Sequence, residues 1–339
     1  MNCMHDAEND QNMKRLAIVI PAYKAAYLDE TLRSIATQTC KDFVVYVGDD
    51  ASAYDLRSIC ERWQHDIDLR YYRFENNLGL HDLVAQWERC VALSREPWIC
   101  LFCDDDSMEP ECVEMFYREM SLTGDSYSIY HFNVDIIDAS GNLIRVPAKF
   151  PRILSGREFA IKRFNFQISS FVSEYIFARK AFKKVGGFQS FPRGWCSDDA
   201  TWIKLASGSG IKTIAGPKVK WRYSGQNICS LHEHDREEKI KASIQYLEWI
   251  DQYFRTRSVS TTETTEGEKF IPARTWLYKQ LRSFGASLWD KDLWKRVLWS
   301  RAIDREPLLK ALSRMLLWDF KINFIDKLSA LKRGTKYFF

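Results

Sequence analysis

Residues 16–50 of this 339-residue chain read LAIVIPAYKAAYLDETLRSIATQTCKDFVVYVGDD. Leu16–Ile20 and Phe43–Val47 are short apolar runs rich in β-branched and aromatic residues, which is typical of strands buried on both faces of a parallel sheet. Between them, residues 28–35 repeat leucine and isoleucine at helical spacing. The order strand, helix, strand predicts a β–α–β unit that ends in an acidic pair, Asp49-Asp50.

The same alternation continues along the chain. Ile99–Cys103 is a third apolar run, and residues 56–63 and 83–91 before it have helical spacing. Such alternation predicts a doubly wound α/β domain, which binds its ligands beyond the carboxyl ends of the strands. Further on, Tyr127–Ile137 and Leu143–Val146 flank a turn and predict a β-hairpin.

Charge is distributed unevenly. The net charge of +4 is the sum of two unequal regions. Residues 270–339 contain 15 Lys and Arg and 6 Asp and Glu, and are therefore basic. The other 269 residues contain 34 Lys and Arg and 39 Asp and Glu, and are therefore slightly acidic. The polar, low-complexity segment 258–268 coincides with this boundary and predicts a linker. The C-terminal region also holds five of the twelve tryptophans.

Several classes of protein are excluded. No apolar run reaches the roughly 18–20 residues of a membrane-spanning helix, and residues 1–12 lack the apolar segment of a signal peptide, so we expect a cytosolic protein. The nine cysteines are expected to be reduced thiols, mostly in the core. The turn Pro21–Ala25 contains no glycine, which excludes a dinucleotide-binding fingerprint there.

Three acidic clusters stand where predicted strands end or a helix begins: Asp49-Asp50, Asp104-Asp105-Asp106 and Asp198-Asp199. Adjacent carboxylates repel one another, and a divalent cation between them relieves the repulsion. Oxygen ligands of this kind suit Mg²⁺ or Mn²⁺. A single Asp pair is also compatible with a solvated acidic loop, whereas three aspartates directly after a buried strand favour a cation site.

The sequence resembles the nucleotide-sugar-dependent glycosyltransferases of family 2, which have the GT-A fold. The resemblance covers about residues 14–225 and is carried, in order, by Ala17–Tyr23, Asp42–Ser52, Phe102–Pro110, and Val185–Phe188 followed by Ser197–Trp202. It implies a GT-A α/β fold: a doubly wound mixed sheet flanked by helices, with an appended helical C-terminal region.

The resemblance assigns the donor site residue by residue. Nucleotide-sugar binding is implied for Pro21, Ala22, Tyr23, Asp49, Asp50, Asn77, Gly79 and Asp104. A divalent cation, Mn²⁺ or Mg²⁺, is implied at Asp105 and Asp106. Counted back from Pro110, the family's D-x-D motif places its second Asp on Asp105 and its first on Cys103, which leaves open which two of the three aspartates contact ribose and metal.

The catalytic base of the family precedes an aromatic residue by four positions. Trp202 follows Asp198 at this distance, which nominates Asp198, with Asp199 as the alternative. The resemblance makes Glu174 and Trp195 candidate contacts of the acceptor. The alternative for Glu174 is a hydrogen-bonded glutamate on the surface, and the alternative for Trp195 is packing in the core. The family often has a His or Arg after this region. Trp221–Ser224 matches that feature loosely, and His232 or His234 would complete a site.

The implied reaction is inverting transfer of a sugar from a nucleoside-diphosphate donor to a hydroxyl of a glycan or a lipid-linked acceptor, in bacterial-type surface polysaccharide synthesis (capsule or O-antigen). A sugar-nucleotide nucleotidyltransferase is the first alternative, although it normally opens with a glycine-rich phosphate loop. A non-catalytic glycan- or lipid-binding relative is the second. No nucleic-acid-binding module is recognised.

The expected organisation is a flexible N-terminus (1–13), a GT-A domain (14–235), a helical extension (236–257), a linker (258–269) and a basic, Trp-rich helical region (270–339). An amphipathic pattern in the last region fits peripheral binding to the anionic inner face of the plasma membrane. Packing of the same apolar face on the catalytic domain, or on a second copy in a homo-oligomer, is the alternative.

Overall fold

The computed structural model describes residues 14–225, 227, 235–258, 276–277, 279–280 and 284. All of these belong to one compact unit, Met1–Ala286. The predicted N-terminal segment 1–13, nearly all of the linker and most of the basic region 270–339 lie outside the described residues.

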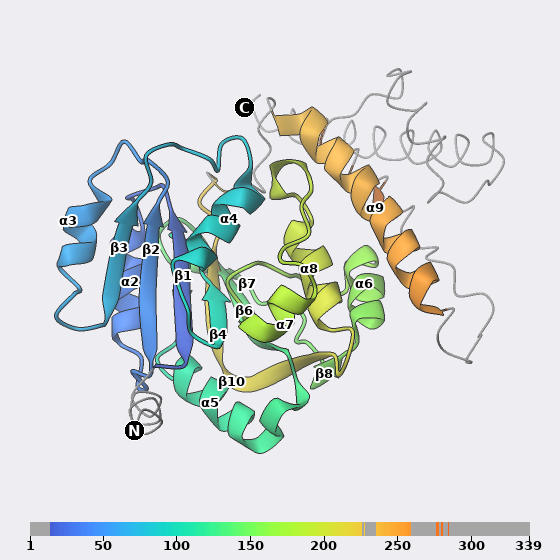
Figure 1. Ribbon diagram of the computed structural model, residues 1–339, viewed down its shortest axis with the longest axis horizontal. Helices are drawn as coiled ribbons and strands as arrows, with labels where there is room; N and C mark the ends of the chain where they lie inside the picture. The colour runs from blue at the N-terminus through green and yellow to red at the C-terminus, as the bar shows by residue number, and fades with distance from the viewer. Residues whose placement is uncertain are drawn as a thin grey trace, which may run out of the picture. The chain divides into compact units, whose positions relative to one another are not determined.

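Within the described residues, ten strands form one mixed sheet (Figure 1). Eight of them follow the order β3-β2-β1-β4-β9-β6-β10-β5, while β7 pairs with β6 and β8 with β10. Their bounds are β1 Leu16–Ala22, β2 Phe43–Asp49, β3 Leu69–Arg73, β4 Trp98–Leu101, β5 Ser107–Met108, β6 Ile129–Ile137, β7 Leu143–Arg145, β8 Ile153–Leu154, β9 Tyr175–Ala178 and β10 Ile211–Arg222.

Helices flank the sheet, as the sequence predicted. Their bounds are α2 Leu28–Ala36, α3 Leu56–Glu61, α4 Leu83–Ala92, α5 Cys112–Thr123, α6 Gly156–Phe164, α7 Arg179–Lys184, α8 Ser197–Leu205 and α9 Arg236–Ser258. Two short 3-10 turns, η1 Gly124–Ser126 and η2 Pro192–Gly194, complete the described elements.

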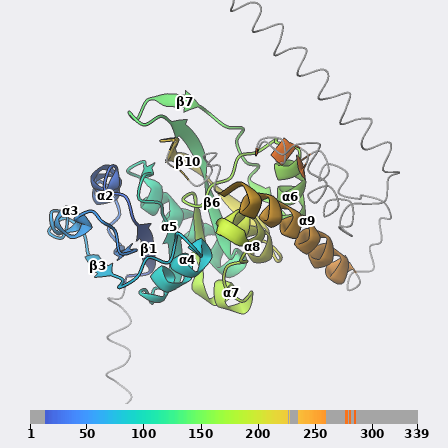
Figure 2. The same ribbon diagram turned by 90° about the horizontal axis from the view of Figure 1, so that it is seen from above.

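The first half of the sheet is parallel, since β1 pairs in parallel with both β2 and β4, and β2 with β3. Side chains such as Ile18 and Val45 join the core under α2, α3 and α5, and α4 packs on the opposite face (Figure 2). The approach of α4 is close, because a Cβ added to Gly48 of β2 would lie 2.5 Å from Sγ of Cys90. The continuous apolar runs in the sequence of β1 and β2 are thus explained by burial on both faces of the sheet.

The second half of the sheet changes direction. Strand β9 is antiparallel to β4 and to β6, whereas β10 is parallel to β6. Strand β10 has a register shift between Ile214 and Val219, where Gly216 takes a φ of +106° that favours glycine. After this bulge β10 pairs with β5, which directly follows the Asp triplet, so the end of β10 lies beside that triplet. The predicted hairpin is confirmed, because β7 pairs antiparallel with β6.

Helix α9 packs against α8 and η2, and a buried aromatic cluster joins it to α6. Tyr246 of α9 is 1% exposed, and its ring contacts Phe164 of α6 and Phe191. Trp276, from the N-terminal part of the basic region, is 5% exposed and contacts the rings of Phe164 and Tyr246. Trp276 therefore packs against α6 and α9.

The cysteines and helices of the described part bear on its class. The seven cysteines described there are all free thiols, and four of them are buried. Among the described helices, none combines the length and the apolar character that crossing a membrane requires.

Candidate active site

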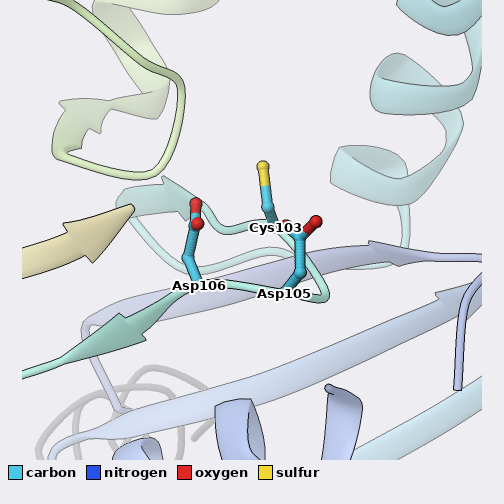
Figure 3. Close-up of side chains that lie close together, drawn as sticks. All are labelled: Cys103, Asp105 and Asp106. Carbon is cyan, nitrogen blue, oxygen red and sulfur yellow. The ribbon is translucent and has the colours of Figure 1, made fainter. Parts of the chain in front are cut away.

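Three neighbouring carboxylates lie in the loop that joins β4 to β5. Asp104, Asp105 and Asp106 are 6%, 4% and 1% exposed. Figure 3 shows the side chains of Asp105 and Asp106 rising from this loop together with that of Cys103. Burying three adjacent acids requires compensating partners, since an uncompensated buried charge is strongly unfavourable.

Asp104 holds the turn that follows β1. Its Oδ2 accepts hydrogen bonds from the backbone N–H groups of Tyr23 (2.9 Å) and Lys24 (2.8 Å). Burial raises the pKa of Asp104, while Lys24 and the two N–H groups act in the opposite direction. Asp104 thus connects the Pro-x-Tyr turn to the acidic loop.

Lys24 also reaches the next carboxylate. Its Nζ donates to Oδ2 of Asp105 at 2.8 Å and lies 3.8 Å from Oδ1 of Asp104. Burial by itself would lower the pKa of Lys24, but the two carboxylates raise it above its ordinary value. The ammonium group therefore stays charged between Asp104 and Asp105.

Asp106 is held from the other side of the loop. Its Oδ2 accepts a hydrogen bond from Oγ of Ser173 at 2.5 Å, and its Oδ1 accepts one from the backbone N–H of Arg222 at 2.9 Å. Burial and the neighbouring Asp105 raise the pKa of Asp106 to about 7. Near neutral pH this carboxyl is poised between its two protonation states.

Arg222, the last residue of β10, is 1% exposed and joins several elements. Its Nε donates to the backbone carbonyl of Asp105 at 2.9 Å, and its Nη1 donates to the carbonyls of Asp138 and Ala139 in the β6–β7 turn. Its Nη2 pairs with Glu30 of α2. The planar guanidinium group can satisfy all of these acceptors at once.

The cluster fits a divalent cation through its oxygen atoms. Cys103, Asp105 and Asp106 each place one ligand atom within 4.8 Å of the others. Burial raises the pKa of Cys103 well above its ordinary value, so its thiol stays protonated and is no ligand for a hard cation. Asp105 and Asp106 remain as an oxygen pair suited to Mg²⁺ or Mn²⁺.

The acidic pair at the end of β2 is fully engaged by the protein. Asp49 accepts hydrogen bonds from the backbone N–H of Ser52 at 2.8 Å, from Tyr71 and from Nη1 of Arg73 at 2.7 Å. Asp50 accepts from the backbone N–H groups of residues 78 and 79 at 2.7 and 2.8 Å and pairs with Arg89. Both carboxylates therefore fix the walls of the site.

The loop Asn76–Gly79 is anchored on Asp50 from both ends. Nδ2 of Asn77 donates to the backbone carbonyl of Asp50 at 3.0 Å. Gly79 lies so close that an added Cβ would be 2.7 Å from Oδ2 of Asp50. The residues assigned to the nucleotide in this region, including Tyr23, which is 40% exposed, are thus brought together around the ends of β1 and β2.

The third acidic cluster begins α8. Asp198 and Asp199 occupy the first turn of the helix, where the backbone N–H groups favour negative charge. Burial and Asp199 raise the pKa of Asp198 to about 7. Asp199 is 3% exposed and is paired with Nε of Arg163 at 2.8 Å, whereas Asp198 is only partly buried.

Glu174 connects the two acidic regions electrostatically. It is 0% exposed, and burial raises its pKa well above the ordinary value, with Asp106 and Asp198 both adding to the increase. Nε2 of His131 lies 3.4 Å from its Oε1, and burial lowers the pKa of His131 to about 3, so the two form a neutral pair. Glu174 is therefore not the surface glutamate that was the alternative for it, and its contact with the acceptor stays a prediction.

The segment before α8 is conformationally constrained. Arg193 and Cys196 have φ values of +57° and +62°, a region that non-glycine residues seldom adopt and that often marks functional loops. Trp195 between them is half-buried, and its ring contacts Phe284 with 5.4 Å between centroids. His232 and His234 lie outside the described residues.

The family profile described as "Glycosyl transferase family 2" matches residues 17–186, about half of the chain, and spans the β1 turn, the acidic pair of β2 and the Asp triplet. The chain belongs to glycosyl transferase family 2. As a member of this family it is a glycosyltransferase, and the resemblance inferred from the sequence is confirmed. No curated protein sequence matches the chain.

Solved structures share the fold of this glycosyltransferase. S. aureus TarS 1–349 in complex with UDP-GlcNAc superposes with a TM-score of 0.55 at 14% identity, and the match covers 80% of each chain. The same fragment in complex with UDP gives a TM-score of 0.50 at 14% identity and again covers 80% of each chain. The predicted GT-A fold class is therefore confirmed.

Some residues of this site were not found from the sequence. Arg163 pairs with Asp199 across 36 positions, and Lys24 with Asp105 across 81. Ser173 and Asn227 also touch the triplet, since Nδ2 of Asn227 lies 3.3 Å from Oδ2 of Asp105. A signal for Lys24 existed, because it directly follows the Pro-x-Tyr turn.

Substituting Gly79→Ala should destabilise the glycosyltransferase by about 1–3 kcal/mol. The new methyl group would collide with Asp50, whose carboxylate cannot retreat without losing its hydrogen bonds. Urea unfolding measures the change. Gly208→Ala is the matched control, since an added Cβ there meets nothing within 4 Å. Equal stability of the two variants would contradict the rigid anchoring of this loop.

Proposed function

We propose that this glycosyltransferase moves a sugar from a nucleoside-diphosphate donor to a hydroxyl of a glycan or lipid-linked acceptor, with inversion at the anomeric carbon. The observation that carries the proposal is the pairing of two acidic regions. Asp106 of the buried triplet Asp104–Asp106 and the partly buried Asp198 at the start of α8 both raise the pKa of the same residue, Glu174. One region suits a diphosphate with its cation, and the other suits a base.

The ends of β1 and β2 are the proposed nucleotide site. Pro21 and Ala22 at the end of β1 and Tyr23 directly after it belong to this site. Asp49, Asp50, Asn77 and Gly79 fix its wall, and Asp104 connects it to the other two aspartates of the triplet. Ligands of doubly wound sheets bind at this edge. The TarS structures, which share the fold, contain UDP-GlcNAc and UDP, and this supports a nucleotide-sugar donor.

Asp105 and Asp106 are the proposed ligands of a divalent cation, Mn²⁺ or Mg²⁺. When bound, such a cation neutralises the charge that develops on the departing diphosphate. The protein's own part is to hold both carboxylates in place, which Ser173 and Arg222 do for Asp106 through hydrogen bonds. Burial, and after it the charge of Asp105, raises the pKa of Asp106, and a bound cation would stabilise the carboxylate against both effects.

Asp198 is the proposed catalytic base. Its pKa of about 7 lets it accept a proton near neutral pH, and its partial exposure leaves it accessible. The acceptor oxygen bonds to the anomeric carbon as the bond from that carbon to the diphosphate oxygen breaks, and the hydroxyl proton passes to Asp198. One displacement of this kind inverts the anomeric centre. Asp199 is less suited, because it is buried and paired with Arg163.

The alternatives are less well supported. A sugar-nucleotide nucleotidyltransferase disagrees with the family to which the chain belongs. A non-catalytic relative would need neither a carboxyl with a pKa near 7 at the start of α8 nor a pair of carboxylates that suits a divalent cation.

A role in surface polysaccharide synthesis and peripheral binding to the inner face of the plasma membrane belong to the same proposal. The excess of basic charge in residues 270–339 supports attraction to anionic lipid. Trp276, Leu277 and Phe284 of this region are not available to bind a membrane, because they are buried in the described unit. The membrane hypothesis therefore applies to residues after 284.

A screen of nucleoside diphosphates and nucleotide sugars, each with and without Mn²⁺, tests the donor proposal. A ligand that binds only the native state raises its apparent stability, by about 2.7 kcal/mol at a hundredfold excess over Kd. We expect at least one nucleoside diphosphate to raise Tm, and to raise it further with Mn²⁺. Thermal shift measures both effects. No stabilisation by any nucleotide would refute a nucleotide-sugar donor.

Asp198→Asn should lower kcat by at least about 100-fold while leaving nucleotide binding unchanged, because the amide cannot take the acceptor proton. Transfer of radiolabelled sugar and isothermal titration with the nucleotide measure the two quantities. Asp125→Asn, an exposed aspartate in η1, is the matched control. Full turnover by the Asp198 variant would remove this residue from the mechanism.

The pH profile should report the same base. The active form of Asp198 is the carboxylate, so kcat/KM should fall about tenfold per pH unit below pH 7 and level off above it. Saturating Mn²⁺ keeps Asp106 ionised during the measurement, since a bound cation favours the carboxylate. A profile that is flat from about pH 5.5 to 8.5 would be inconsistent with a base of this pKa.

A further inference from the structure

Lys24 reaches the carboxylate that the proposed function assigns to the cation. Its Nζ lies 2.8 Å from Oδ2 of Asp105 and 3.8 Å from Oδ1 of Asp104. Its backbone N–H is fixed by Asp104 at 2.8 Å, so the residue is held at both ends of its side chain by the triplet. The side chain is 26% exposed, which leaves it a route out of the cluster.

No other basic side chain takes this position in residues 14–225 and the other described segments. Lys24 is the one basic residue there that forms an ion pair with the side chain of Asp105. Arg222 is close, but it donates to the backbone carbonyl of Asp105 and forms its ion pair with Glu30. Asn227 donates to the same Oδ2 without carrying charge.

A divalent cation and the ammonium group of Lys24 would meet at the same carboxylate. Both are positive and both need an oxygen of Asp105, so binding of one weakens binding of the other through Coulomb repulsion and shared lone pairs. Asp106 makes no ion pair with Lys24 in the described structure, so the competition concerns Asp105.

We propose that Lys24 competes with the divalent cation for the carboxylate of Asp105 and thereby sets the cation concentration that the enzyme needs. The ammonium group compensates the buried triplet while no cation is bound, and it leaves Asp105 when the cation enters. This inference rests on the proposed function, in which Asp105 and Asp106 hold the cation.

Binding of Mn²⁺ alone, without nucleotide, tests the competition. Lys24→Met should bind Mn²⁺ at least about tenfold more tightly than the unchanged protein, because an apolar side chain does not compete for Asp105. Lys24→Arg keeps a positive charge and should retain weak binding. Lys183→Met, an exposed position on α7, is the matched control and should not change the affinity. Electron paramagnetic resonance of free Mn²⁺ measures all four proteins.

A second measurement uses the unchanged protein and does not depend on a variant. Acetic anhydride modifies free amines, and the extent of modification at each lysine can be read by mass spectrometry. Addition of Mn²⁺ should increase labelling of Lys24, since its ammonium group leaves Asp105, and should leave labelling of Lys183 constant. Unchanged labelling of Lys24 at saturating Mn²⁺ would overturn the proposal.

The outcomes separate this inference from the proposed function. If the unchanged protein binds Mn²⁺ and Lys24→Met binds it with the same or lower affinity, the competition is wrong while the cation site stands. If the unchanged protein and Lys24→Met both fail to bind Mn²⁺, with UDP present as well as without it, the cation part of the proposed function fails together with this inference.

Discussion

Compensation of buried negative charge is the constraint on which this glycosyltransferase's structure depends. Five aspartates at strand ends, Asp49, Asp50, Asp104, Asp105 and Asp106, are each less than 7% exposed. Every one of them receives hydrogen bonds from backbone N–H groups, from arginine or lysine, or from hydroxyl and amide groups. These partners come from β3, α4, β10 and several loops, including the turn after β1. The same contacts that compensate the charge therefore fix how the elements meet.

The parallel half of the fold could be predicted from the sequence because its signals are local. The apolar runs at Leu16–Ile20 and Phe43–Val47 lie within β1 and β2, and the segment with helical spacing at 28–35 became α2. Strands β3, β9 and β10 were not predicted. Strand β3 is half exposed at the sheet edge, and β10 is interrupted by Gly216-Pro217, which in sequence resembles a turn.

The acidic residues of the site could be found for the same reason, since adjacent aspartates after an apolar run are visible in one stretch. Their partners could not, because pairs such as Arg163 with Asp199 form only after the chain has folded. Burial is equally invisible in the sequence. The surface alternative for Glu174 was wrong, because Glu174 lies inside the domain beside a neutral His131, and its contact with the acceptor stays a prediction.

Arg222 has a consequence for how freely the sequence can vary. One guanidinium group serves the carbonyl of Asp105, the β6–β7 turn and Glu30, and so bridges three parts of the chain. A lysine side chain has a single nitrogen, so it could not donate to all of these acceptors at once. The neighbours Trp221, which is half-buried, and Tyr223, which is exposed, do not bridge these described parts of the chain by side-chain hydrogen bonds. Among homologues, position 222 should thus be nearly invariant while the residues on either side of it drift.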